Sequence, residues 1–141
     1  MRLMIAKEEL LNSIIDDIFK LDSPPVDVGR RKQIGEFVIS SVNGDNPVAH
    51  LVTNATLGEN NKGAIVYILT DLRLIKVDIG AKEIKSNSFP VYTIIGVERK
   101  LLDDGRSQFS VSFQSGSFGL KYSQDDKKIT DFFQKIEARA S

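Results

Sequence analysis

The segment from Ile65 to Ile79 constrains the fold more than any other part of the chain, because two apolar runs flank the sequence Thr70-Asp71-Leu72-Arg73. This arrangement predicts a β-hairpin that closes across Thr70 to Arg73 and pairs Leu69 with Leu74. In that register one face is wholly apolar and carries Ala64, Val66, Ile68, Ile75, Val77 and Ile79. The opposite face is largely apolar and carries Ile65, Tyr67, Leu69, Leu74, Lys76 and Asp78.

A hairpin with apolar side chains on both faces needs a cover on both, because exposed apolar surface is unfavourable in water. The second face, through Ile65, Tyr67, Leu69 and Leu74, is therefore a predicted interaction surface. We expect its cover to be the N-terminal helices or a second copy of the chain.

Length and composition narrow the class of protein. A chain of 141 residues suits one domain with a short appendage. Acidic and basic residues balance at 19 each, so no overall field favours nucleic acid or anionic lipid. Cysteine is absent, which excludes disulfides, thiolate metal ligands and cysteine nucleophiles. Without a signal-peptide core or a run of about 20 apolar residues, a cytoplasmic protein is expected.

Residues 1–45 form a predicted helical extension, and residues 46–141 a predicted domain. Between Lys7 and Lys20 the apolar residues recur at helical spacing, as Leu10, Leu11, Ile14, Ile15, Ile18 and Phe19. A second stripe predicts a helix from Val26 to Val42, which Asn43-Gly44 would end. A strand at Phe37 to Ile39 is the alternative.

After Pro47 the pattern predicts a strand from Val48 to Leu57, the central hairpin, and a short strand from Lys85 to Ser88. Two further turns, Asp103-Asp104-Gly105 and Ser115-Gly116, predict a three-stranded meander. Its expected pairs are Val97 with Val111, Ile95 with Phe113, Phe113 with Phe118, Val111 with Leu120, and Phe109 with Tyr122. A helix capped at Ser123 to Asp126 closes the chain, with the apolar stripe Ile129, Phe132, Phe133 and Ile136.

Several of these motifs resemble those of the bacterial pleckstrin-homology-like (PH-like) group, over about residues 47–140. They are the turn Leu69-Thr70-Asp71-Leu72-Arg73-Leu74-Ile75, the segment with Pro90, Tyr92, Ile95 and Val97-Glu98, the strand with Phe109, Val111 and Phe113, and the final helix with Phe132-Phe133. The resemblance implies an α+β fold, in which a PH-like antiparallel β-sandwich or barrel carries a C-terminal amphipathic helix. One or two N-terminal helices would precede it.

By resemblance, such domains are modules that mediate protein association, often as oligomers. Eukaryotic PH domains that bind phosphoinositides use a basic cluster between the first two strands. The matching loop here offers only Lys62, beside Glu59. The resemblance therefore does not extend to inositol-phosphate binding.

Individual polar residues indicate little chemistry. His50 is the only histidine, and without a second histidine or a cysteine it is interpreted as a bystander rather than a metal ligand. Thr70, Asp71 and Arg73 are interpreted as a turn in which Asp71 bonds its own turn, Thr70 closes it and Arg73 forms a nearby ion pair. A binding tip is the alternative. No pattern predicts a catalytic, metal-binding or cofactor-binding residue.

The basic run Arg30-Arg31-Lys32, with Lys62 and Arg73, is the predicted contact for an anionic surface. The leading interpretation is a cytoplasmic, non-catalytic interaction or scaffold module whose partner is a protein or a second copy of the chain. Peripheral binding to anionic lipid is the alternative, and nucleic acid is not an expected partner.

Overall fold

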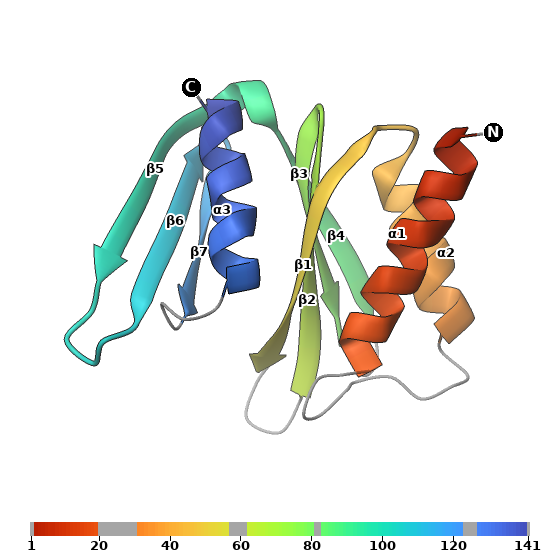
Figure 1. Ribbon diagram of the computed structural model, residues 1–141, viewed down its shortest axis with the longest axis horizontal. Coiled ribbons are helices and arrows are strands. Elements are labelled where there is room, and N and C mark those ends of the chain that lie inside the picture. Colours follow the sequence, from red (N-terminus) through yellow and green to blue (C-terminus); the bar gives the residue numbers. More distant parts are fainter. Residues whose placement is uncertain (1, 20–30, 57–61, 81–82, 123–126, 141) are drawn as a thin grey trace. The chain divides into compact units, whose positions relative to one another are not determined.

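The computed structural model describes residues 2–19, 31–56, 62–80, 83–122 and 127–140. The chain divides into two compact units, Met1–Ser88 and Phe89–Ser141, whose elements are labelled in Figure 1. The first unit contains α1 (Arg2–Phe19), α2 (Arg31–Val42), β1 (Pro47–Thr56), β2 (Lys62–Thr70), β3 (Arg73–Ile79) and most of β4 (Ile84–Pro90). The second contains η2 (Val91–Thr93), β5 (Ile94–Leu101), β6 (Ser107–Phe113), β7 (Gly116–Tyr122) and α3 (Lys127–Ala140).

The first unit is a four-stranded sheet in the order β1-β2-β3-β4, with α1 and α2 on one face (Figure 1). The predicted hairpin is β2–β3, in which Leu69 pairs with Leu74 and Val66 with Val77. Its register is the predicted one. The helices pack on its wholly apolar face, and the shared core contains Ile14, Ile15, Ile18, Ile34, Val38, Val42, Ala64, Val66, Ile68, Ile75, Val77 and Ile79.

The N-terminal helices therefore do not cover the second face of the hairpin, which they were predicted to cover. Ile65, Tyr67, Leu69 and Leu74 are all outside the core that α1 and α2 share with the sheet. Even so, Tyr67, Leu69 and Leu74 are only 2%, 0% and 1% exposed in the single chain. These three side chains are therefore covered within the chain, and only Ile65 is partly exposed. The interaction surface itself stays a prediction.

α2 confirms the predicted helix and excludes the alternative strand at Phe37 to Ile39; residues 26–30 lie outside the described ranges. The helix ends where predicted, because Asn43 and Gly44 have φ angles of +48° and +87°. This left-handed conformation is easiest for glycine and, among other residues, asparagine. The reversal lets the Asp45 amide donate to the Val42 carbonyl at 3.1 Å, which brings Asp45 to the helix end.

The second unit is a three-stranded sheet in the order β5-β6-β7, with α3 packed on one face. The predicted stripe of α3 is buried: Ile129, Phe132, Phe133 and Ile136 are 9%, 2%, 1% and 0% exposed. Phe133 stacks on Phe109 of β6, with ring centroids 3.8 Å apart. Arg99 of β5 and Glu137 of α3 add an ion pair. The predicted cap at Ser123 to Asp126 lies outside the described residues.

The β6–β7 hairpin forms, but its register differs from the predicted one by two residues. Phe118 pairs with Val111, and Phe113 pairs with Gly116. A shift of two keeps every side chain on its predicted face, so the apolar pattern cannot distinguish the two registers. The space beside Phe113 is occupied by Phe89, whose ring stacks on it with centroids 4.7 Å apart.

β5 pairs Val97 with Val111 as predicted, but Ile95 does not pair with Phe113. Ile94 takes that place, because the register shifts between Ile94 and Gly96. Such a β-bulge adds one residue to a strand and reverses the direction in which the next side chain points. Ile95 is consequently 69% exposed instead of buried.

Candidate functional site

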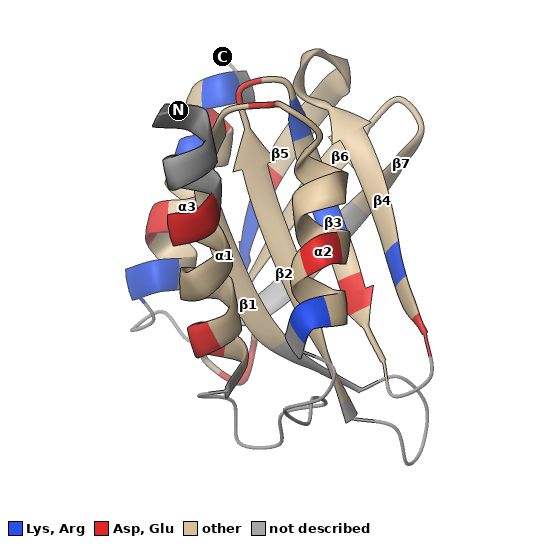
Figure 2. Ribbon diagram, turned by 90° about the vertical axis from the view of Figure 1, so that its right-hand side faces the viewer, with Lys and Arg blue, Asp and Glu red and all other residues tan. Residues whose placement is uncertain are grey.

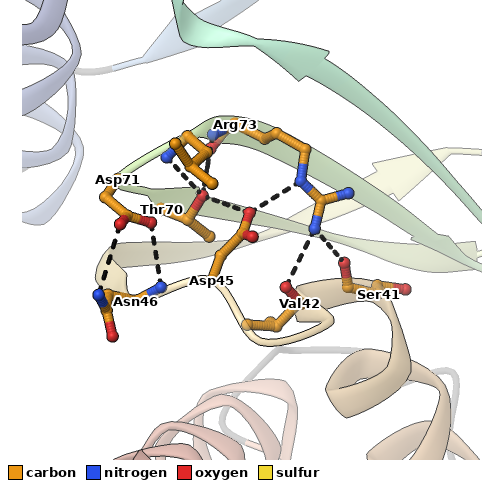
Figure 3. A network of polar contacts seen from close by, with 8 residues as sticks. Ser41, Val42, Asp45, Asn46, Thr70, Asp71 and Arg73 are labelled. Atoms are coloured by element: carbon orange, nitrogen blue, oxygen red, sulfur yellow. Dashed lines mark hydrogen bonds and ion pairs between the residues drawn. The ribbon is translucent and has the colours of Figure 1, made fainter.

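The densest set of polar contacts joins the end of α2 to the turn of the central hairpin (Figure 3). We call it the Arg73 network; it consists of Asp45, Asn46, Thr70, Asp71 and Arg73. Thr70 lies at its centre and is fully buried. Its Oγ1 accepts hydrogen bonds from the amides of Leu72 at 3.1 Å and Arg73 at 2.9 Å. It also lies 2.9 Å from Asp45 Oδ2, so Thr70 closes the turn as predicted.

The Arg73 side chain turns back from the hairpin onto the helix end. Its Nε donates to Asp45 Oδ2 at 2.8 Å, and its Nη2 donates to the carbonyls of Ser41 and Val42 at 3.1 and 3.0 Å. The last carbonyls of a helix have no partner within the helix, and the helix dipole makes that end negative. The guanidinium supplies both the missing donors and the complementary charge.

Asp71 corrects one sequence-based interpretation, because it does not bond its own turn. Its carboxylate accepts hydrogen bonds from the Asn46 backbone amide at 3.0 Å and from the Asn46 side-chain amide at 3.4 Å. The Asp71 amide in turn donates to the Asn46 carbonyl at 3.0 Å. Asp71 therefore fixes the start of β1 against the hairpin.

The Arg73 network joins the end of α2 to the central hairpin. The Arg73 side chain is 25% exposed and is bound to Asp45, whose side chain is 10% exposed. Its Nε and Nη2 donors are directed at Asp45 and the α2 carbonyls, and the anionic contact of Arg73 stays a prediction. Thr70 and Arg73 have structural contacts in this turn, and the alternative of a binding tip stays a prediction.

The other predicted cations are not gathered around Arg73. Lys32 is in the first turn of α2, about 14 Å along the helix from the carbonyls that Arg73 binds, at 1.5 Å per residue. Its side chain is 88% exposed and lies 4.0 Å from Glu36. Arg31 also belongs to α2 and Lys62 begins β2, whereas Arg30 lies outside the described residues.

His50 of β1 contacts two side chains of α1. Its Nε2 lies 3.2 Å from Asp17 Oδ2 and 3.3 Å from Ser13 Oγ. Both neighbours approach the same ring nitrogen, which differs from a catalytic triad, where serine and aspartate use opposite nitrogens. Among the residues that the structure describes, no group of three or more His, Cys, Asp and Glu side chains is placed to hold a metal ion.

Tyr67 is the ionisable group that its surroundings perturb most clearly. Burial of the phenol, together with a smaller effect of the nearby carboxylate of Asp78, raises its pKa to about 12. Desolvation and a negative neighbour both oppose formation of the phenolate. Tyr67 is therefore a neutral core residue at physiological pH.

The sequence did not reveal where apolar side chains reach the surface. Tyr92 is 87% exposed, and Ile95 and Leu101 are each 69% exposed. They belong to η2 and β5 of the second unit. Ile95 was predicted to be buried, and nothing in the apolar pattern indicates the bulge that turns it outward. Gly96, directly after it, is the one local signal, since glycine inside a strand is typical of bulges.

None of the helices in the described ranges combines the length and the hydropathy that a transmembrane helix requires. The chain matches no protein-family model, and no curated protein matches it.

A crystal structure of a pleckstrin homology domain from Shewanella amazonensis is similar to this chain, with a TM-score of 0.50 and 18% sequence identity. The match covers 81% of this chain and 98% of that one. The matched share of this chain is larger than the share that residues 46–141 make up. At this identity the likeness concerns the fold. With its two antiparallel sheets, N-terminal helices and C-terminal helix, the chain has the α+β fold of a bacterial PH-like domain, as its motifs predicted.

Proposed function

We propose that this protein is a non-catalytic PH-like module that binds another protein through Tyr92 and Ile95. The exposure of these two side chains carries the proposal: an 87% exposed tyrosine and a 69% exposed isoleucine lie three residues apart, where η2 leads into β5. Large apolar side chains in water are unfavourable when they cluster, and tyrosine is enriched in protein interfaces. A protein partner would remove this surface from water.

The polar residues support binding rather than catalysis. Thr70, Asp71 and Arg73 are committed to the Arg73 network, and His50 joins two elements. The groups that could activate a nucleophile or transfer a proton therefore serve as structural contacts. This part of the proposal agrees with the association role that the PH-like resemblance implies.

Site-specific photocrosslinking in the native host tests the proposal. A photoreactive phenylalanine analogue replaces Tyr92 or Ile95, and the same analogue at Ser117, an exposed position on β7 of the same unit, is the matched control. We expect a discrete adduct with one protein from position 92 or 95 and none from 117. Equal adducts from all three positions, or none from any, would contradict the proposal.

Peripheral binding to anionic lipid is the second candidate, and the exposed ammonium of Lys32 is the observation in its favour. The relevant cations are Arg30, Arg31, Lys32 and Lys62, since Arg73 is bound internally. Sedimentation with phosphatidylcholine vesicles, with and without phosphatidylserine at low salt, decides between the candidates. Pelleting that depends on phosphatidylserine and is lost in Lys32→Glu would favour the membrane.

A further inference from the structure

The turn after α2 contains the dipeptide Asn43-Gly44, through which the chain leaves the helix and continues to β1 (Figure 2). Both residues are exposed and have positive φ angles. Within the described ranges no hydrogen bond holds the Asn43 carboxamide. A Cβ atom at Gly44 would meet nothing within 4 Å except its own chain neighbours. The turn is therefore open to water, and its amide group is free to react.

An exposed asparagine that precedes glycine can lose its side-chain amide without an enzyme. The Gly44 backbone nitrogen attacks Asn43 Cγ, so that an N–Cγ bond forms and the Cγ–Nδ2 bond breaks. Nδ2 leaves as ammonia with the proton that the Gly44 nitrogen gives up, and the product is a cyclic succinimide. Glycine favours this closure because it has no side chain to obstruct the approach.

Water then opens the succinimide at one of two bonds. Cleavage between the Gly44 nitrogen and Cγ gives an ordinary aspartate. Cleavage between that nitrogen and the backbone carbonyl carbon gives isoaspartate, in which the main chain runs through Cβ and Cγ. Isoaspartate therefore adds a carbon atom to the main chain.

Other asparagines of the chain are less suited to this reaction. Asn43-Gly44 is the only Asn-Gly pair in the sequence. Asn46 precedes Pro47, whose nitrogen has no proton to give up. Asn87 is exposed in β4 but precedes Ser88, whose side chain obstructs the closure.

Arg73 binds the chain on both sides of this dipeptide (Figure 3). Its Nη2 donates to the Ser41 and Val42 carbonyls, and its Nε donates to Asp45 Oδ2. The Asp45 amide also donates to the Val42 carbonyl. These contacts require a fixed separation between Val42 and Asp45, which an extra main-chain atom changes. The new carboxylate also lies at the negative end of the α2 dipole.

We propose that Asn43 is a site of spontaneous deamidation, and that isoaspartate formed there opens the Arg73 network as the protein ages. The reaction consumes water and releases ammonia, and it needs no other reactant. The proposal goes beyond the proposed function, since Asn43 is in the first unit, whereas Tyr92 and Ile95 belong to the second.

Incubation of the full chain at mildly alkaline pH tests the proposal, with peptide mapping by mass spectrometry at intervals. Asn87 is the control within the same sample. We expect Asn43 to be converted to acid well before Asn87, and an isoaspartate methyltransferase to label the product at position 43. Anion exchange separates the deamidated chain by its additional negative charge. Urea denaturation should then show a lower midpoint for the deamidated chain than for the fresh chain.

Two variants separate the causes. Asn43→Gly removes the carboxamide and keeps a residue that readily adopts the left-handed conformation, so its urea midpoint should not change during the same incubation. Freshly prepared Asn43→Asp has the new carboxylate without the added main-chain atom and should lose less stability than the deamidated chain.

Three results would each overturn the proposal: conversion of Asn43 no faster than that of Asn87, a deamidated chain as stable as the fresh one, or an Asn43→Asp variant as destabilised as the deamidated chain.

Discussion

Arg73 shows how one side chain can determine the geometry of several elements. Its guanidinium binds Asp45 and the carbonyls of Ser41 and Val42, groups that are about 30 residues away along the chain. Arg73 of the hairpin motif therefore makes structural contacts. The sequence predicted an ion pair for Arg73, but it could not identify the partners, because those depend on how α2 ends.

We expect Arg73→Ala to lower the free energy of unfolding by about 2–3 kcal/mol, since it leaves the mostly buried Asp45 carboxylate and two helix carbonyls without their donor. Arg73→Lys should lose about 1 kcal/mol, because one ammonium cannot reproduce the planar set of donors. Urea denaturation measures both changes. Arg106→Ala is the control: it removes an ion pair whose partners are about half exposed, and such pairs contribute roughly 0–1 kcal/mol. Equal losses at positions 73 and 106 would contradict this role of the Arg73 network.

Tyr67 gives a prediction for alkaline pH. Its phenol has a pKa of about 12 in the folded chain, against about 10 for an unperturbed tyrosine. Between about pH 10 and 12 the unfolded chain has lost the phenol proton that the folded chain still binds. The contribution of Tyr67 to the free energy of unfolding is therefore fully present below about pH 10 and falls as the pH rises toward 12. When the chain is titrated to alkaline pH, phenolate absorbance should show one group that ionises at a higher pH than an unperturbed tyrosine. That component should be absent in Tyr67→Phe. A variant in which this component is unchanged would show that another tyrosine is responsible.

The elements themselves differ in how far the sequence determined them. The β2–β3 register was predictable, because the turn residues fix the loop and both faces are apolar. The β6–β7 register was not predictable, since a shift of two residues leaves the same side chains on the inward face. The contact beside Phe113 comes from Phe89, which belongs to a different strand. The bulge at Ile95 was missed for a related reason. A pattern of period two contains no signal for an inserted residue.

The docking of α3 can be tested at Phe133. This side chain is 1% exposed and stacks on Phe109, so Phe133→Ala should lower the free energy of unfolding by about 3–5 kcal/mol through lost burial and a cavity. Phe133→Leu should lose much less, because it keeps most of the volume. Gln134→Ala, at an exposed neighbouring position, is the control. Chemical denaturation compares the three, and a small loss for Phe133→Ala would show that α3 is not docked through its predicted stripe.

At the scale of the whole molecule, the N-terminal helices share the core of the first unit. Ile14, Ile18, Ile34 and Val38 are at most 1% exposed, and they pack on the apolar face of the hairpin. Burying four such side chains contributes roughly 6–12 kcal/mol of gross transfer free energy, at about 1.5–3 kcal/mol each. That amount is comparable with the net stability of a typical domain.

A chain of residues 46–141 should therefore aggregate or fail to unfold cooperatively, because deletion of residues 1–45 exposes Val66, Ile68 and Val77. Light scattering and thermal denaturation of the truncated and full chains measure this. Here the boundary at residues 45 and 46 remains a proposal. A monomeric truncated chain that melts cooperatively would show that the two helices are dispensable.

The bulge in β5 has a further consequence. β5 is at one end of its sheet, and the backbone of such a strand is a template on which identical strands can stack into fibrils. The inserted residue disturbs the regular spacing of amides and carbonyls that this stacking requires. We therefore expect the irregularity that turns Ile95 toward water also to hinder polymerisation of the chain through this edge.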